Sequence, residues 1–150
     1  MGINLNDPDF VRGLITYDWT YCFNAECPRT AECIRFISSK YKPEGDTMGK
    51  AVFPDANLHG PCKHFMRVRL YRAAWGVNRI FDQVKHRDVP NIKGAIMDAL
   101  GSRTSYYRVY RGEKHLSPEE QDVVAKIFKQ HGYEAPTYDH YASEIGFAFE

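Results

Sequence analysis

The sequence predicts an α+β fold that is mainly helical, in which a cysteine-bearing N-terminal section packs on a C-terminal bundle of three or four helices. Cysteine occurs only in the first 62 residues, one or two short strand patterns lie in the middle of the chain, and helical patterns dominate after Pro90. A chain of 150 residues has the size of one ordinary domain. We therefore expect a single domain over 1–150, with the cysteine-bearing section at 1–66 and the helical section at 67–150.

The N-terminal section contains two short helical patterns and one strand pattern. Phe10, Leu14 and Tyr17 fit about one and a half turns of helix, and a second helix is predicted over 30–41. Residues 51–53 fit a short strand that ends at the following proline.

The spacing of the apolar residues changes in the middle of the chain. From residue 64 to about 71, apolar and basic side chains alternate, as they do in a strand with one buried face. The next residues show helical spacing through Trp75, Ile80, Phe81 and Val84, so we expect the strand to pass into a helix over 74–84.

Three helices are predicted in the C-terminal section, over 91–100, 102–111 and 118–131, each followed by a glycine that can end a helix. Ser117 and Glu120 have the spacing of a capping box at the start of the last one. The tail beyond them is aromatic, and we expect it to pack back onto the body.

Composition excludes several classes of protein. The hydrophobic fraction of 43% and the charged fraction of 26% are those of a soluble globular protein, and no apolar run is long enough to span a membrane. The start of the chain lacks the pattern of a signal peptide, so we expect a cytoplasmic protein whose thiols stay reduced.

The net charge of +1 hides an asymmetry along the chain. Between Lys63 and His115 there are twelve Lys and Arg against four Asp and Glu, and the remainder has eight against fifteen. Such separation suits an anionic partner for the basic half, although intramolecular ion pairs on a solvated surface explain it equally well.

The four cysteines suggest a metal site. Four residues separate Cys22 from Cys27, five separate Cys27 from Cys33, and twenty-eight lie before Cys62. Four thiolates can hold a tetrahedral zinc ion, and His59 and His64 are reserve ligands beside the last cysteine. The alternatives are an iron–sulfur cluster, four packed thiols or a disulfide. No Cys-x-x-Cys is present, which disfavours thioredoxin-type chemistry.

A shared metal also predicts where the local helix begins. If residues 27–33 were all helical, Cys27 and Cys33 would lie about 9 Å apart along the axis, which is too far for one zinc ion. If Thr30 is the N-cap, Cys33 falls in the first turn and Cys27 in the loop before it. Metal binding therefore predicts a late helix start and an irregular segment at 22–29.

The basic half is similar to the helix-turn-helix of small bacterial DNA-binding domains. Ile96 and Leu100 fit buried positions of a first helix, Gly101 the turn, and Tyr107 and Tyr110 buried positions of a second helix. Met97 departs from the pattern, which usually has alanine there. The outward face would then offer side chains that can contact phosphates and guanine edges, namely Arg103, Thr104, Ser105, Arg108 and Arg111. A helical hairpin that serves only packing is the alternative.

Motifs of catalysis are absent from the sequence. There is no Gly-rich phosphate loop, no His-Glu-x-x-His and no Gly-x-Ser-x-Gly, and Asp139-His140 is more typical of a surface pair than of an acid–base pair. We therefore name no catalytic residue and favour a protein that is not an enzyme.

Several segments together resemble a family of short uncharacterised proteins from Bacteroidetes, classed as a domain of unknown function. They are CFNAECPRTAECIRF, the later Cys62, YRAAWGVNRIFD, GSRTSYYRVYRGEKHLSPEEQ and IFKQHGYEAPTYDHYASE. The resemblance implies a bacterial cytosolic protein that forms one full-length domain, and it implies no activity.

Two functional hypotheses follow. The first is a small nucleic-acid-binding, regulatory protein whose arginine-rich helix contacts DNA and whose cysteines hold zinc as a structural clip. The second is a metal- or cluster-bearing module for protein interaction without a nucleic acid partner.

Overall fold

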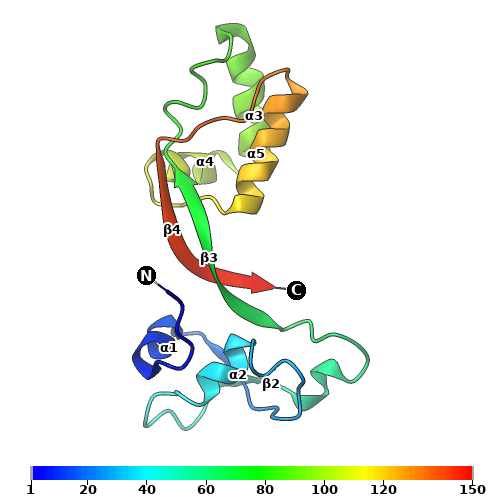
Figure 1. Cartoon of the computed structure of the whole chain (residues 1–150). Coiled ribbons are helices and arrows are strands. Elements are labelled where there is room, and N and C mark those ends of the chain that lie inside the picture. The colour runs from blue at the N-terminus through cyan, green and yellow to red at the C-terminus, as the bar shows by residue number, and fades with distance from the viewer. Residues whose placement is uncertain (1, 150) are drawn as a thin grey trace. The chain divides into compact units, whose positions relative to one another are not determined.

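The computed structural model describes residues 2–149, which contain five α-helices, two 3-10 helices and two two-stranded sheets (Figure 1). In chain order the elements are α1 (Pro8–Leu14), β1 (Thr20–Cys22), α2 (Ile34–Ser39), β2 (Lys50–Val52), η1 (Pro54–Asn57), β3 (Met66–Trp75), η2 (His86–Asp88), α3 (Val89–Ala99), α4 (Arg103–Tyr110), α5 (Pro118–Gln130) and β4 (His140–Phe149).

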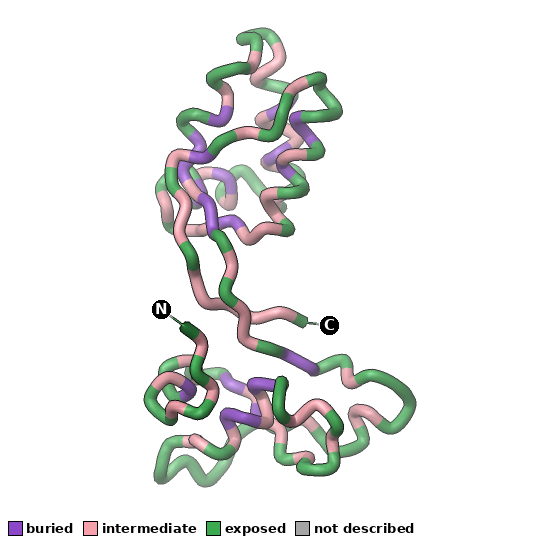
Figure 2. Tube along the Cα trace, in the orientation of Figure 1, coloured by how far each residue is buried: buried purple, intermediate pink, exposed green. Residues whose placement is uncertain are grey.

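The chain forms two compact units, Met1–Leu70 with Ile145–Glu150 and Tyr71–Glu144. The first division falls inside strand β3, and the second falls inside β4, its partner in one of the two sheets. Each unit has its own cluster of buried side chains, and Figure 2 colours the buried residues purple along the Cα trace.

The first unit packs two short helices against a small parallel sheet. Strand β1 pairs with β2 in a register that sets Cys22 opposite Val52, and α2 contacts both β1 and α1. Trp19 lies in the core, where its indole Nε1 donates to the Oγ of the fully buried Ser38 over 2.9 Å. The Trp19 ring also meets Phe147 edge-on at 5.5 Å, so the C-terminal strand contributes to this core.

The second unit is built around α3, which packs against both α4 and α5. Its core contains Ile92 and Ile96 from α3, Val109 from α4 and Phe128 from α5, all almost fully buried. Leu116 joins them and exchanges two backbone hydrogen bonds with Ala74 of β3.

The predicted fold class is wrong in its main feature. The fold is α+β, but the C-terminal half is not a bundle of three or four helices, because two strands of ten residues each accompany its three α-helices. The tail was expected only to pack back, and it forms one of these strands. A single strand is not stable without a hydrogen-bonded partner. The tail is a strand because it pairs with β3.

The predicted helix over 74–84 is also absent from the described structure. Strand β3 continues to Trp75, and Gly76 then takes a positive φ of +78°. The backbone N–H groups of Asn78 and Arg79 donate to the carboxylate of Asp139, and the N–H groups of Asp82 and Val84 bond to carbonyls three residues earlier. The segment therefore forms turns, although Ile80 is still buried as an apolar helical residue would be.

The predicted N-caps of α4 and α5 and the glycines after α3, α4 and α5 agree with the structure. Ser102 caps α4 by accepting the N–H of Ser105, and Ser117 and Glu120 form the expected capping box of α5. Gly101, Gly112 and Gly132 all have positive φ after their helices.

Among the described residues, none of the helices combines the length and apolar character that a bilayer-crossing segment requires.

Candidate metal centre

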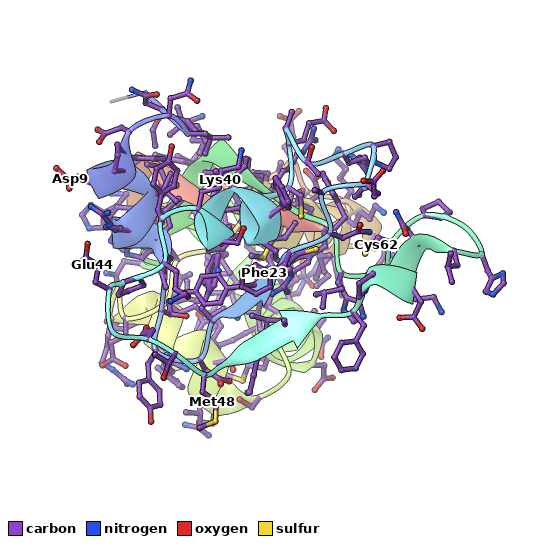
Figure 3. All side chains as sticks on the ribbon, turned by 90° about the horizontal axis from the view of Figure 1, so that it is seen from below. Asp9, Phe23, Lys40, Glu44, Met48 and Cys62 are labelled. Atoms are coloured by element: carbon purple, nitrogen blue, oxygen red, sulfur yellow. The ribbon has the colours of Figure 1, made fainter. Side chains whose placement is uncertain are left out.

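All four cysteines of the chain line one cavity of about 440 Å³ in the first unit. Cys22 ends strand β1, Cys27 lies in the irregular segment that follows, and Cys33 is the residue before helix α2. Cys62 lies in the loop between η1 and β3, where Figure 3 labels it. The fold thus gathers thiols from distant positions at one place.

A single asparagine organises the segment after Cys22. The side-chain oxygen of Asn24 accepts the N–H of Glu26 over 3.2 Å, and its backbone carbonyl accepts the N–H of Cys27 over 3.3 Å. Its side-chain amide donates to the carbonyl of Pro54 over 3.3 Å. Asparagine favours such turns because its side chain can bond to nearby backbone groups. The predicted irregular segment is confirmed over 23–29, whereas Cys22 is the last residue of β1.

The late start of the following helix is confirmed, but the predicted N-cap is wrong. Helix α2 begins at Ile34 and its N-cap is Cys33, not Thr30. The backbone N–H groups of Glu32 and Cys33 both donate to the carbonyl of Arg29 over 3.1 Å, which closes a turn before the helix. Cys33 is therefore placed at the helix start, and not one turn inside it.

The thiols are close enough to influence one another electrostatically. Burial raises the pKa of Cys22, a hydrogen bond from the backbone N–H of Asn24 lowers it, and the charges of Cys33, Cys27 and Cys62 raise it further. At the other end of the cavity, the backbone N–H of His64 donates to the Sγ of Cys62 over 3.4 Å. Two of the four sulfurs thus accept a backbone N–H from the residue two positions further on.

The donor set fits a soft divalent metal. All four cysteines are free thiols, and thiolates are the ligands of structural zinc sites. In the structure of residues 2–149, no three His, Cys, Asp or Glu side chains are already arranged as ligands of one ion. Metal binding therefore requires the thiols to come closer together than they lie in this structure. His64 lines the cavity, whereas His59 is exposed outside its lining, so only one of the two reserve ligands lies at the site.

A family model described as a family of unknown function, DUF6078, matches residues 5–147. The chain belongs to this family. No curated protein and no solved structure matches the chain significantly. The predicted resemblance to a domain of unknown function is thereby confirmed at the level of the family.

In this DUF6078 chain the predicted nucleic-acid contacts lie on α4 and the residue after it. Four of the five side chains are exposed, namely those of Arg103, Thr104, Arg108 and Arg111. Ser105 is half-buried, and its backbone N–H donates to the side chain of the cap residue Ser102. The Arg111 guanidinium is held by both carboxylate oxygens of Glu113, over 2.8 and 3.2 Å. Arg103 and Arg108 are therefore the more available cations.

The predicted inner face of α4 is wrong. Tyr106 and Val109 are buried, whereas Tyr107 is half-buried and Tyr110 is 45% exposed. Either pair has the three-residue spacing of a helical stripe, so periodicity alone could not choose between them. On the outer side the guanidinium of Arg103 lies 5.4 Å from the centroid of the Tyr107 ring. Lys93 of α3 also lies 5.4 Å from that centroid and, by donating a hydrogen bond, lowers the pKa of Tyr107.

The sequence prediction missed a histidine cluster in the second unit. The His115 ring stacks on Trp75 with centroids 3.8 Å apart, and its Nδ1 is bonded to the carboxylate of Glu144. Tyr71 donates to the other oxygen of that carboxylate over 3.4 Å. No local pattern in the sequence indicates partners so far along the chain. The Asp139 carboxylate accepts two backbone N–H groups of a turn. This structural role accounts for the aspartate without a catalytic role.

Arg35 is the second residue that sequence reasoning missed. It lies in the wall of the cysteine cavity, and its guanidinium donates to two backbone carbonyls from other segments. An arginine two residues after a cysteine has no distinctive signal in a sequence.

Proposed function

We propose that this DUF6078 protein is a metal-binding protein of the bacterial cytoplasm in which Cys22, Cys27, Cys33 and Cys62 hold one zinc ion as a structural clip. The observation that carries the proposal is the convergence of every cysteine of the chain on one cavity. Chance packing of buried thiols does not require all of them to meet in one place.

Electrostatics supports a cation at this position. Burial and, to a smaller extent, the charges of the other three thiols raise the pKa of Cys22, so a cation beside Cys22 would favour its thiolate form. A divalent metal is such a cation, and binding it releases thiol protons. Arg29 and Arg35 line the same cavity and offset part of the negative charge of a four-thiolate site.

Elemental analysis of protein purified without chelators tests the proposal. We expect about one zinc ion per chain, and Cys33→Ser and Cys62→Ser should each lower this content markedly. Met48→Ser is the matched control, because it removes a sulfur from a side chain that is 95% exposed outside the cavity. A metal-free wild-type protein with four titratable thiols would contradict the proposal and leave packed thiols as the explanation.

The same sample decides between zinc and the alternative cofactor. An iron–sulfur cluster would make the protein brown and would give iron and sulfide in place of zinc. Replacement of zinc by Co²⁺ should give the intense absorption of tetrahedral thiolate coordination.

The second candidate function is contact with nucleic acid through α4, in line with the helix-turn-helix-like reading of the sequence. It is supported by the exposure of Arg103, Thr104, Arg108 and Arg111 on one helix and its C-cap, and by the absence of acidic residues from α4 itself. Neutralised phosphates release counterions, so an affinity that arises in this way falls steeply as salt rises. The competing role is a zinc-clipped module that binds another protein and no nucleic acid.

Fluorescence anisotropy with a mixed-sequence DNA duplex at low and high salt separates these roles. Arg108→Ala should weaken binding about fivefold or more, whereas Lys129→Ala, which removes an exposed cation on α5, should change it little. Absence of binding by the wild-type protein at low salt would leave the protein-interaction role.

A further inference from the structure

Arg35 connects three of the four cysteine-bearing segments through one side chain. It lies in the first turn of α2, two residues after Cys33. Its Nε donates to the backbone carbonyl of His64 over 2.9 Å, and its Nη1 donates to the carbonyl of Thr20 over 3.2 Å.

The two carbonyls that Arg35 binds belong to segments whose cysteines line the cavity. Thr20 precedes Cys22 by two residues in strand β1. His64 follows Cys62 by two residues, and its own N–H donates to the Sγ of Cys62. The carbonyl of His64 is thus bound by the Arg35 guanidinium, and the N–H of His64 is bound to the sulfur of Cys62.

The loop that carries Cys62 needs such a tether. Residues 58–64 have no regular secondary structure, and His64 itself is exposed. Beyond it, Phe65 is buried and lies under the guanidinium of Arg29, 3.4 Å from the ring centroid. Two arginines of the cavity wall therefore act on adjacent residues, and Arg35 also binds the backbone of two separate segments.

We propose that Arg35 is a positioning residue of the four-cysteine metal site: it fixes the Cys22 and Cys62 segments against the helix start that carries Cys33. This inference rests on the proposed zinc function. Arg35 makes no bond to the metal, and it acts by holding the ligand segments at the separation that one ion requires. Outer-shell partners of metal ligands contribute about 10- to 100-fold to metal affinity.

A planar guanidinium suits this role better than an ammonium group. Its donors are arranged in a rigid fork and can reach two fixed acceptors at once, whereas lysine offers one flexible point charge. Arg35→Lys therefore keeps the charge and loses the double attachment.

Arg29→Ala provides the matched control. Arg29 lines the same cavity and carries the same charge, but its side chain bonds to Glu32 and lies over Phe65. If positive charge beside the thiolates were all that mattered, removing either arginine would have the same effect on metal affinity.

The test uses the full chain and measures Zn²⁺ affinity by competition with a chromophoric chelator, together with the Co²⁺ absorption spectrum. We expect Arg35→Ala and Arg35→Gln to lower zinc affinity about 10-fold or more and to alter the Co²⁺ bands. Arg35→Lys should recover little of the loss, and Arg29→Ala should stay within about threefold of the wild type. If Arg35→Ala does not fold, Arg35→Gln and Arg35→Lys carry the comparison.

The outcomes separate this inference from the proposed function. Wild-type protein that binds one zinc ion, with Arg35 variants of unchanged affinity and spectrum, would overturn the positioning role alone. Full recovery by Arg35→Lys, or an equal loss in Arg29→Ala, would overturn it in favour of a simple charge effect. Wild-type protein that binds no Zn²⁺ or Co²⁺ would overturn both proposals.

Discussion

Gly76 lies so close to Asp139 that a Cβ atom added at position 76 would stand 2.7 Å from the Cβ of the aspartate. The carbonyl of Gly76 accepts the backbone N–H of Asp139 over 3.1 Å. The Asp139 carboxylate in turn accepts the N–H groups of Asn78 and Arg79, each over 3.0 Å. One aspartate thus closes the turn that follows β3, and this closure leaves no room for a side chain opposite.

Gly76→Ala should therefore destabilise the protein by about 2–4 kcal/mol. The left-handed backbone conformation, with φ at +78°, costs a residue with a Cβ about 1–2 kcal/mol, and the contact with Asp139 adds an overpacking cost. Urea denaturation monitored by circular dichroism measures the loss.

Gly94→Ala is the control for this substitution. Gly94 lies inside helix α3 without positive φ, and a Cβ there would meet no atom within 4 Å. Alanine at this position should stabilise the protein by about 0.5–1 kcal/mol, because glycine is unfavourable inside a helix. A similar destabilisation by both substitutions would show that the Gly76 turn is not special.

The sequence predicts α3, α4 and α5 well, because apolar spacing and local end signals mark them, although α3 lacks a side-chain cap at its start. Ser117 and Glu120 specify the start of α5 by themselves, and glycines with positive φ end all three helices. These features depend on bonds between residues a few positions apart, which a local pattern contains.

The strand pair and the turn at Gly76 could not be predicted in the same way. They depend on partners some sixty residues away, as in the bonds from Asn78 and Arg79 to Asp139. Apolar residues such as Ile80 have helical spacing, and the prediction of a helix there was wrong, because the segment is a set of turns tied to the distant Asp139. The convergence of the cysteines was expected only from the chemistry that four thiols suggest, and Arg35 had no signal at all.

Removal of the proposed zinc ion should destabilise the protein, because the four cysteines that would bind it lie in the first unit. If free Zn²⁺ exceeds its dissociation constant a few hundredfold to a thousandfold, binding stabilises the folded state by about 3–4 kcal/mol. Excess chelator should therefore lower the unfolding temperature of the wild-type protein and leave that of the double variant Cys22→Ser, Cys62→Ser unchanged. An equal effect of chelator on both proteins would mean that the cysteines are not the ligands.

The stability of the second unit should fall at high pH because Tyr106 resists ionisation in the folded protein. Burial raises the pKa of Tyr106 from 10.0 to about 12, and the charges of Tyr107 and Tyr110 raise it as well. The resulting stabilisation, about 2–3 kcal/mol, is complete below pH 10 and is lost as the pH rises from there to about 12.

Tyr106→Phe checks this assignment, because it keeps the buried ring and removes the ionisable hydroxyl. Denaturation curves between pH 9 and 12 should show a shallower loss of stability for this variant than for the wild type. Tyr17→Phe, at a fully exposed position, should leave the pH dependence unchanged. Identical curves for Tyr106→Phe and the wild type would contradict the role of Tyr106.

Ser38→Ala should destabilise the first unit by about 1–3 kcal/mol. Ser38 is fully buried, its Oγ accepts the Trp19 indole N–H over 2.9 Å, and it donates to the carbonyl of Arg35 over 3.1 Å. Alanine would leave the indole N–H buried without its acceptor, which costs more than the net value of the hydrogen bond itself. Chemical denaturation followed by tryptophan fluorescence measures the effect.

Ser39→Ala is the matched control, because it removes a bond to the carbonyl of Phe36 in the same helix. It should cost about 0.5 kcal/mol or less, since substitutions away from such buried pairs change stability little. Comparable losses for the two serines would show that the Trp19–Ser38 pair does not anchor α2 in the core.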